Sequence, residues 1–267
     1  MTERSLPTLL LTAFGPFGGD GYNPTQHALD PVAEAVAGHA RIVTEVLPVE
    51  YAAACDRIRR LIRAHHPDVV VSLGLAAGRA AITPERVAIN LAEARIPDEA
   101  GARPLGLPLV DGADAAQFST LPVAAMVEAV AAVDVPAAVS YSAGTFVCNA
   151  VMYAALEEIR MQEEACVRED AGPAGSPAGA SAEVASGPSA VAGFIHVPQA
   201  AEADGAAADE SDVRTCERSM TQAQIDRGLS AAVRASVEHR GRPPVAPQGA
   251  LHATTGEERA LGIGATD

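Results

Sequence analysis

The stretch SYSAGTFVCNAVMY, residues 140–153, places a cysteine where it could act as a nucleophile. An apolar run and the short loop Ser-Ala-Gly-Thr precede Cys148, and a helical pattern begins around it. With Thr145 as the N-cap, Cys148 lies in the first turn, where free backbone N–H groups and the helix dipole favour an anion. Both effects lower the pKa of a thiol. A buried structural cysteine is the alternative interpretation, and the position alone does not decide between the two.

Two further side chains could complete a catalytic set with this cysteine. His196 stands near the end of the apolar strand pattern GFIHVP, and a thiol nucleophile needs an imidazole as base and then as acid. Glu85, in ITPERVAIN, could orient that imidazole and stabilise its charged form. A satisfied edge histidine and a solvated loop carboxylate are the competing interpretations. If the strand before Cys148 and the strand carrying His196 are neighbours, both side chains lie at one sheet edge.

A glycine-rich loop, in TAFGPFGG, follows the first strand pattern. It lacks the spacing of the common phosphate-binding glycine motifs. It carries Phe14 and Phe17, two of only 5 phenylalanines in the chain, and Phe146 lies beside the candidate nucleophile. These rings predict either an aromatic wall of a binding pocket or an anchor of the loop to the core.

The elements that must position these residues alternate between strand and helix. Apolar runs predict strands at 8–14, 41–49, 68–74, 86–92, 136–141 and 190–198. Helical spacing predicts helices at 24–37, 51–65, 121–133, 146–165 and 222–238. Asn23 followed by Pro24 is typical of the start of the first helix. The alternation predicts an α/β protein with a mostly parallel sheet between helices.

Composition predicts the domain organisation. Residues 1–239 are expected to form a single α/β domain. Within it, residues 170–188 are small, aperiodic and rich in proline and glycine, which predicts a flexible insertion, and residues 200–212 predict a mobile acidic loop. Residues 240–267 predict a disordered tail.

Bulk properties of the 267 residues disfavour several classes of function. Net charge is −15, with 34 acidic against 19 basic residues, which disfavours nucleic acid as a partner. No run approaches the roughly 20 apolar residues of a membrane span, and no secretory signal is recognised. The 4 cysteines lack CxxC spacing, which argues against a zinc site or a disulfide framework. We therefore expect a cytoplasmic protein with reduced thiols, no metal and no cofactor.

Three motifs, in order along residues 9–198, resemble the pyroglutamyl peptidase I (pyrrolidone carboxyl peptidase) family of cysteine peptidases. They are LLLTAFGPFGGDGYNPT, GRAAITPERVAINLAEARIPD, and SYSAGTFVCNAVMY followed by GFIHVP. The resemblance implies a three-layer α/β/α sandwich around a twisted, mostly parallel mixed sheet, often assembled into tetramers. It also implies an exopeptidase that releases N-terminal pyroglutamate from peptides through a thioester and needs no cofactor.

The resemblance implies a role for each matching residue. Cys148 matches the family's nucleophile, His196 its histidine and Glu85 its glutamate. The wall of the pyroglutamyl pocket falls on Phe14, Phe17, Phe146, Val147 and Ile96. Arg95, in ARIPD, matches an arginine associated with the oxyanion.

Two departures from the family pattern bear on substrate affinity. Leu75 replaces the glutamine of GQAGGR, and the loop after His196 reads HVPQAAEAD where the family often has HIPYLPEQ. One alternative is therefore a non-catalytic protein that binds pyroglutamyl peptides. A second alternative is a nucleoside phosphorylase on a related sandwich, although the chain shows no basic glycine-rich cradle for phosphate.

Overall fold

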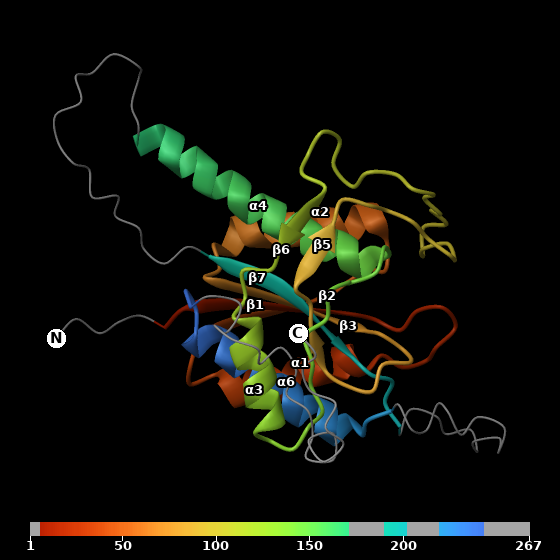
Figure 1. Ribbon diagram of the computed structural model, residues 1–267, viewed down its shortest axis with the longest axis vertical. Coiled ribbons are helices and arrows are strands. Elements are labelled where there is room, and N and C mark those ends of the chain that lie inside the picture. Colours follow the sequence, from red (N-terminus) through yellow and green to blue (C-terminus); the bar gives the residue numbers. More distant parts are fainter. Residues whose placement is uncertain (1–5, 171–189, 202–218, 243–267) are drawn as a thin grey trace, which may run out of the picture.

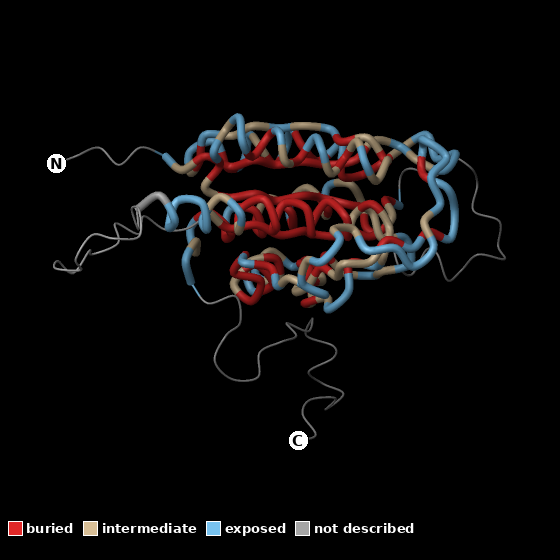
Figure 2. Tube along the Cα trace, turned by 90° about the horizontal axis from the view of Figure 1, so that it is seen from above, coloured by how far each residue is buried: buried red, intermediate tan, exposed pale blue. Residues whose placement is uncertain are grey.

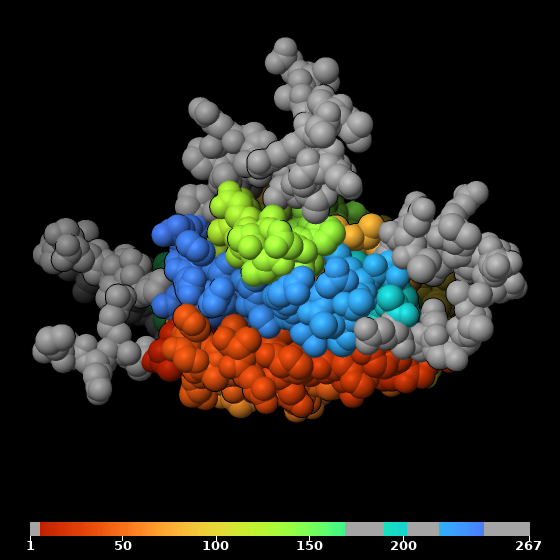
Figure 3. Space-filling model, turned by 90° about the horizontal axis from the view of Figure 1, so that it is seen from below, coloured from red at the N-terminus to blue at the C-terminus, as the bar shows by residue number. Residues whose placement is uncertain are grey.

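The computed structural model describes residues 6–170, 190–201 and 219–242, and these form three layers. Helices α2 and α4 cover one face of a central sheet, and α1, α3 and α6 cover the other (Figure 1). The helices are α1 (Pro24–Val36), α2 (Tyr51–His65), α3 (Val123–Ala131), α4 (Val147–Asp170) and α6 (Gln222–Glu238). In the view of Figure 3, α6 lies between α1 and α3, which agrees with its contacts to both.

The central sheet has five strands in the order β2-β1-β3-β7-β4. They are β1 (Thr8–Phe14), β2 (Arg41–Leu47), β3 (Val69–Leu75), β4 (Thr83–Pro84) and β7 (Val191–Val197). All neighbouring pairs are parallel except β4 with β7. The expectation of a mostly parallel mixed sheet between helices is confirmed. A separate antiparallel pair joins β5 (Val87–Ile89) to β6 (Ala116–Phe118).

Side-chain alternation along β1 divides the core into two halves. All seven residues of β1 are buried, as expected for a strand covered on both faces. Leu9 and Leu11 pack in the half beneath α1, α3 and α6, whereas Leu10 and Phe14 pack in the half beneath α2 and α4. The strand period therefore sends Phe14 to the face that α4 covers.

Local sequence rules account for the start of α1 and for the burial of α4. The Asn23 side chain accepts a hydrogen bond from the Thr25 N–H, 3.0 Å, and Pro24 opens the helix, as predicted. Helix α4 is buried from Ala150 to Ile159 and becomes exposed towards its far end (Figure 2). None of the described helices combines the length and the apolar character that crossing a bilayer requires.

The strand predicted at 136–141 is wrong as a regular element. The segment forms only isolated parallel bridges, Ile82 with Ala137 and Glu85 with Ser140. Backbone bonds run from the Ile82 N–H to the Pro136 carbonyl and from the Ser140 N–H to the Pro84 carbonyl. Pro84 has no N–H for the bond between these two, so the ladder is interrupted at its centre.

Three expectations concern segments that lie mostly outside the described residues: the insertion at 170–188, the loop at 200–212 and the tail at 240–267. Their described boundaries belong to the fold. Asp170 ends α4, buried Ala200 bridges to Met220, and Arg240 forms an ion pair with Asp68.

Candidate active site

Cys148 is the second residue of α4 and lines a cavity of about 370 Å³. The prediction of Thr145 as the N-cap is wrong, because its hydroxyl donates to the Glu93 carbonyl, 2.8 Å, and the helix begins at Val147. Gly144, at φ 77°, gives the preceding loop a backbone conformation that residues with a Cβ rarely adopt. The cysteine thus lies in the first turn, as expected, but by a different loop geometry.

His196 and Glu85 form a buried pair. The His196 ring nitrogen Nδ1 lies 2.7 Å from Glu85 Oε1, and the two residues are 4% and 0% exposed. Strand β7 supplies the histidine, and the Glu85 N–H, just after β4, donates to the Phe194 carbonyl of the same strand, 2.8 Å. The interpretation of Glu85 as a solvated loop carboxylate is therefore wrong.

Gly74 brings the cysteine to this pair. In the parallel pairing of β3 and β7, Gly74 is the partner of His196. A Cβ at Gly74 would lie 2.7 Å from the Phe194 ring, closer than real contacts allow, and 3.0 Å from Cys148 Sγ, which is a tight contact. The missing side chain therefore leaves the space in which the thiol sits against the sheet, one strand away from the imidazole.

Substituting Gly74 with alanine is expected to lower activity much more than stability. The added methyl must displace the Phe194 ring, which lies against His196, and it crowds Cys148 Sγ, so the reacting atoms lose their alignment. We expect a loss of about 10²-fold or more in kcat/KM and a destabilisation of about 1–3 kcal/mol, measured by urea unfolding. Gly38→Ala is the control, because a Cβ at Gly38 would meet nothing within 4 Å. Wild-type kcat/KM in Gly74→Ala would contradict this account of the site.

Burial dominates the protonation of the site. Burial, and to a smaller extent the Glu85 charge, raise the pKa of the Cys148 thiol to about 12, while the cysteine's own backbone N–H and Arg79 oppose this. Burial also lowers the pKa of His196, against the opposing hydrogen bond and charge of Glu85. The expectation of a lowered thiol pKa is wrong, because desolvation outweighs the helix start. Both shifts favour the neutral form of their group, the thiol of Cys148 and the imidazole of His196.

The pocket residues predicted from the sequence line the same cavity as Cys148. These residues are Phe14, Phe17, Arg95, Ile96, Phe146 and Val147. The rings of Phe17 and Phe146 lie with centroids 5.5 Å apart and form one wall. Phe14 is only 4% exposed and also belongs to the core. Both interpretations of this ring therefore hold, because it lines the pocket and anchors the glycine-rich loop to the core. Leu75, the departure from the family pattern, lines the cavity too.

Tyr51 supports this wall from behind and was not singled out in the sequence. Its hydroxyl donates to the Thr145 carbonyl, 2.9 Å, and its ring meets Phe146 edge to face with centroids 5.4 Å apart. Tyr51 begins α2, nearly a hundred residues from the nucleophile, so no local pattern indicates this contact.

Asn149, directly after the nucleophile, fixes the segment that carries Arg95 and Ile96. Its fully buried amide accepts from the Ile89 N–H and donates to the Ile89 carbonyl, both at 2.9 Å. It also donates to the Leu91 carbonyl, 3.2 Å. The residue next to the thiol thus joins the start of α4 to the backbone that leads into the pocket's Arg95 and Ile96.

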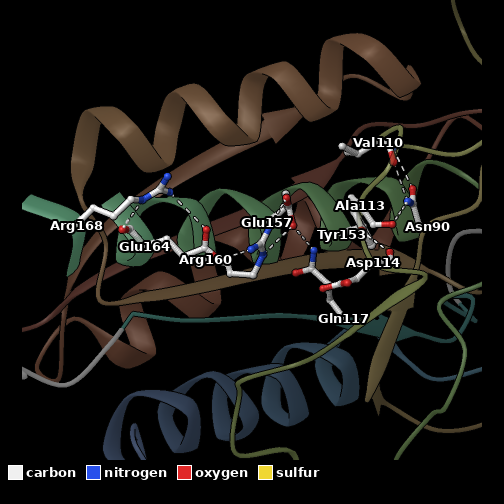
Figure 4. Close-up of polar contacts among 10 residues, drawn as sticks. All are labelled: Asn90, Val110, Ala113, Asp114, Gln117, Tyr153, Glu157, Arg160, Glu164 and Arg168. Atoms are coloured by element: carbon white, nitrogen blue, oxygen red, sulfur yellow. Dashed lines mark hydrogen bonds and ion pairs between the residues drawn. The ribbon is translucent and has the colours of Figure 1, made fainter. Parts of the chain in front are cut away.

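The segment that runs from β5 to β6 also forms hydrogen bonds along α4 (Figure 4). The Asn90 amide closes the loop by donating to the Val110 carbonyl, 2.8 Å, and the Tyr153 hydroxyl donates to the Asp114 carbonyl, 2.6 Å. Further along the helix, Glu157 accepts from Gln117 and pairs with Arg160. Among the described residues, no group of three or more His, Cys, Asp or Glu could hold a metal ion.

The comparisons with known proteins agree with one another. Residues 8–169 match the family model described as pyroglutamyl peptidase. The pyrrolidone-carboxylate peptidase of Clavibacter michiganensis subsp. michiganensis is 38% identical over 232 residues, 87% of this chain and 93% of that relative. The crystal structure of pyroglutamyl peptidase I from Bacillus amyloliquefaciens is 36% identical with a TM-score of 0.70, covering 86% of this chain and 95% of that one.

The pyrrolidone carboxyl peptidase structure from Thermococcus litoralis is 29% identical with a TM-score of 0.73, covering 91% of this chain and 100% of that one. The family-model match includes Glu85 and Cys148 but ends before His196. The position of His196 in the site therefore rests on the β3–β7 pairing and on its contact with Glu85.

Proposed function

The chain belongs to the pyroglutamyl peptidase family of cysteine hydrolases, and on that premise we propose that Cys148, His196 and Glu85 are the residues that remove N-terminal pyroglutamate from peptides. One observation carries the proposal. The absent side chain of Gly74 leaves space for the Cys148 thiol against the sheet, and Gly74 is the strand partner of His196. The Nδ1 atom of His196 in turn contacts the Glu85 carboxylate. The nucleophile also faces the cavity that the phenylalanines line.

Because the pKa shifts favour the neutral thiol and the neutral imidazole, the proposed proton transfers begin from these two forms. His196, with Nδ1–H donated to Glu85, takes the thiol proton on Nε2 as Cys148 Sγ bonds to the pyroglutamyl carbonyl carbon. The imidazolium gives that proton to the leaving amine as the C–N bond breaks, which leaves a thioester. His196 then takes a proton from water, whose oxygen attacks the thioester, and returns it to the leaving thiolate. Glu85 stabilises each imidazolium that forms.

The cavity suits a neutral lactam. A pyroglutamyl end has no free α-amine, so its pocket needs a flat apolar slot and a few backbone hydrogen bonds rather than a carboxylate. Phe17 and Phe146 supply such a wall. In this proposal the backbone N–H groups at the start of α4 stabilise the developing oxyanion, and Arg95, an exposed residue that lines the cavity, assists them.

The direct test compares pyroglutamyl, prolyl and glutaminyl amides that carry the same chromogenic leaving group. We expect hydrolysis of the pyroglutamyl amide alone, with no dependence on phosphate. Binding of a pyroglutamyl peptide in calorimetry without turnover would instead support the non-catalytic alternative. Phosphate-dependent nucleoside cleavage would support a phosphorylase.

We further propose a cytoplasmic location, where a catalytic thiol stays reduced, and assembly into a homo-oligomer, a tetramer by family resemblance. Exposed apolar side chains at Leu105, Leu107 and Phe118 support the assembly, because such side chains often mark interfaces. Sedimentation velocity measures the state, and a monomer at all concentrations would contradict the assembly.

A further inference from the structure

Arg79, in the loop after β3, contacts three parts of the site at once. Its Nη1 donates to Glu85 Oε1, 2.6 Å, and also to the Thr83 hydroxyl. Its Nη2 donates to the carbonyl of Ser142, 3.0 Å, in the loop that precedes the nucleophile. The Thr83 hydroxyl lies 3.4 Å from the His196 carbonyl. One guanidinium therefore joins the carboxylate, the nucleophile's loop and, through Thr83, the histidine's strand.

The Glu85 carboxylate depends on this contact. Oε1 is shared between Arg79 and His196 Nδ1, while Oε2 is buried and finds no hydrogen-bond partner among the described residues. A buried carboxylate needs a counter-charge, and Arg79 provides it. Arg79 itself is 27% exposed and does not line the cavity. It can thus act on the reaction through Glu85, through the loops and through its charge, but not by lining the cavity.

We propose that Arg79 is a positioning residue, which holds the Glu85 carboxylate against His196 and fixes the loop before Cys148 relative to that pair. This role rests on the proposed function of Cys148, His196 and Glu85. The fork geometry of arginine matters, since a single lysine ammonium cannot reach Glu85 and the Ser142 carbonyl through two separate nitrogens.

The guanidinium also biases the imidazole towards its base form. Two charged groups act on the pKa of His196: Glu85, in the segment after β4, and Arg79, in the loop after β3. The titratable thiol of Cys148, on α4, lies beside Gly74, the strand partner of His196. Glu85 raises the pKa of His196 and Arg79 lowers it. Removing Arg79 therefore raises the pKa of His196, and a higher pH is then needed to obtain neutral imidazole.

The test is the pH profile of kcat/KM for Arg79→Met on a pyroglutamyl amide. We expect the midpoint of the acid limb to move to higher pH, because the Arg79 charge lowers the pKa of His196. We also expect kcat to fall about 10²-fold with little change in KM. Arg79→Lys keeps the charge without the fork, so its kcat falls while its midpoint stays near that of wild type. Arg63→Met is the matched control, because Arg63 pairs with another buried carboxylate, Glu158, away from the cavity.

Each outcome decides the matter. Unchanged kcat and midpoint in Arg79→Met, with an active wild type, overturn the role of Arg79 alone. In Arg79→Met, lower kcat with an unmoved midpoint reduces Arg79 to a structural ion pair and also overturns the proposal. An inactive wild type overturns the proposed function itself. If Arg79→Met does not fold, Arg79→Lys carries the test, and restoration of Arg79→Ala activity by added ethylguanidinium, below denaturing concentrations, supports the role.

Discussion

Replacing Cys148 with alanine or serine is expected to reduce kcat/KM on a pyroglutamyl amide by about 10⁴-fold or more. Alanine removes the only atom that can form the thioester. Serine fails for a related reason: the site already raises the pKa of the thiol to about 12, and a hydroxyl in the same place is a far weaker acid. The measurement is initial-rate hydrolysis, with residual activity followed at high enzyme concentration.

Two controls make this result specific. Cys166→Ser changes an exposed thiol at the far end of α4 and should leave kcat/KM unchanged. Cys148→Ala should still bind a pyroglutamyl peptide in calorimetry, because the cavity wall of Phe17 and Phe146 is intact. Near-wild-type turnover by Cys148→Ala would show that another group attacks the substrate and would refute the mechanism.

Glu85→Gln is expected to cost about 10³–10⁴-fold in kcat, with the fold retained. The amide has nearly the same shape but no charge, so the imidazolium that forms during attack loses its stabilisation and the ring loses its fixed tautomer. Glu85 raises the pKa of His196, so its neutralisation lowers that pKa, and the acid limb of the profile moves to lower pH.

The sign of that shift is the sharpest part of the prediction. Neutralising Glu85 moves the limb down, whereas neutralising Arg79 moves it up, because the two charges act on the same imidazole in opposite directions. General destabilisation cannot produce two opposite shifts. Circular dichroism and thermal unfolding serve as fold controls. Matching shifts in the same direction for both variants would exclude His196 as the titrating group.

The regular elements were largely predictable from local patterns. Helix α2 spans the predicted residues 51–65 and α6 spans the predicted 222–238, because both carry a clear apolar stripe and defined ends. The failure at 136–141 has an equally local cause, the missing N–H of Pro84, but its effect appears only when the partner segment is known. A strand pattern in the sequence indicates that a segment can pair, but it does not identify the partner segment.

The route by which Cys148 and His196 meet was not predictable in this way. The sequence argument required their two strands to be neighbours, yet β4 lies between the 137–140 bridges and β7. The residues meet instead because α4 starts over β3, at Gly74. A glycine within an apolar strand gives little sign that a thiol will fill the space of its absent side chain.

The sequence alone determined the chemical inventory: one thiol at a helix start, an imidazole and a carboxylate in recognisable motifs, and phenylalanines around a glycine-rich loop. Only the tertiary structure decided which effect dominates the pKa of the thiol. A helix start lowers the pKa of a thiol, but burial against the sheet and the nearby Glu85 charge outweigh it at Cys148. Electrostatic energies depend on solvent exclusion and on distances between charged and polar groups. Some of these groups are remote in sequence, such as Arg79 and the Ser142 carbonyl, or Glu85 and His196, and they come together only once the chain has folded.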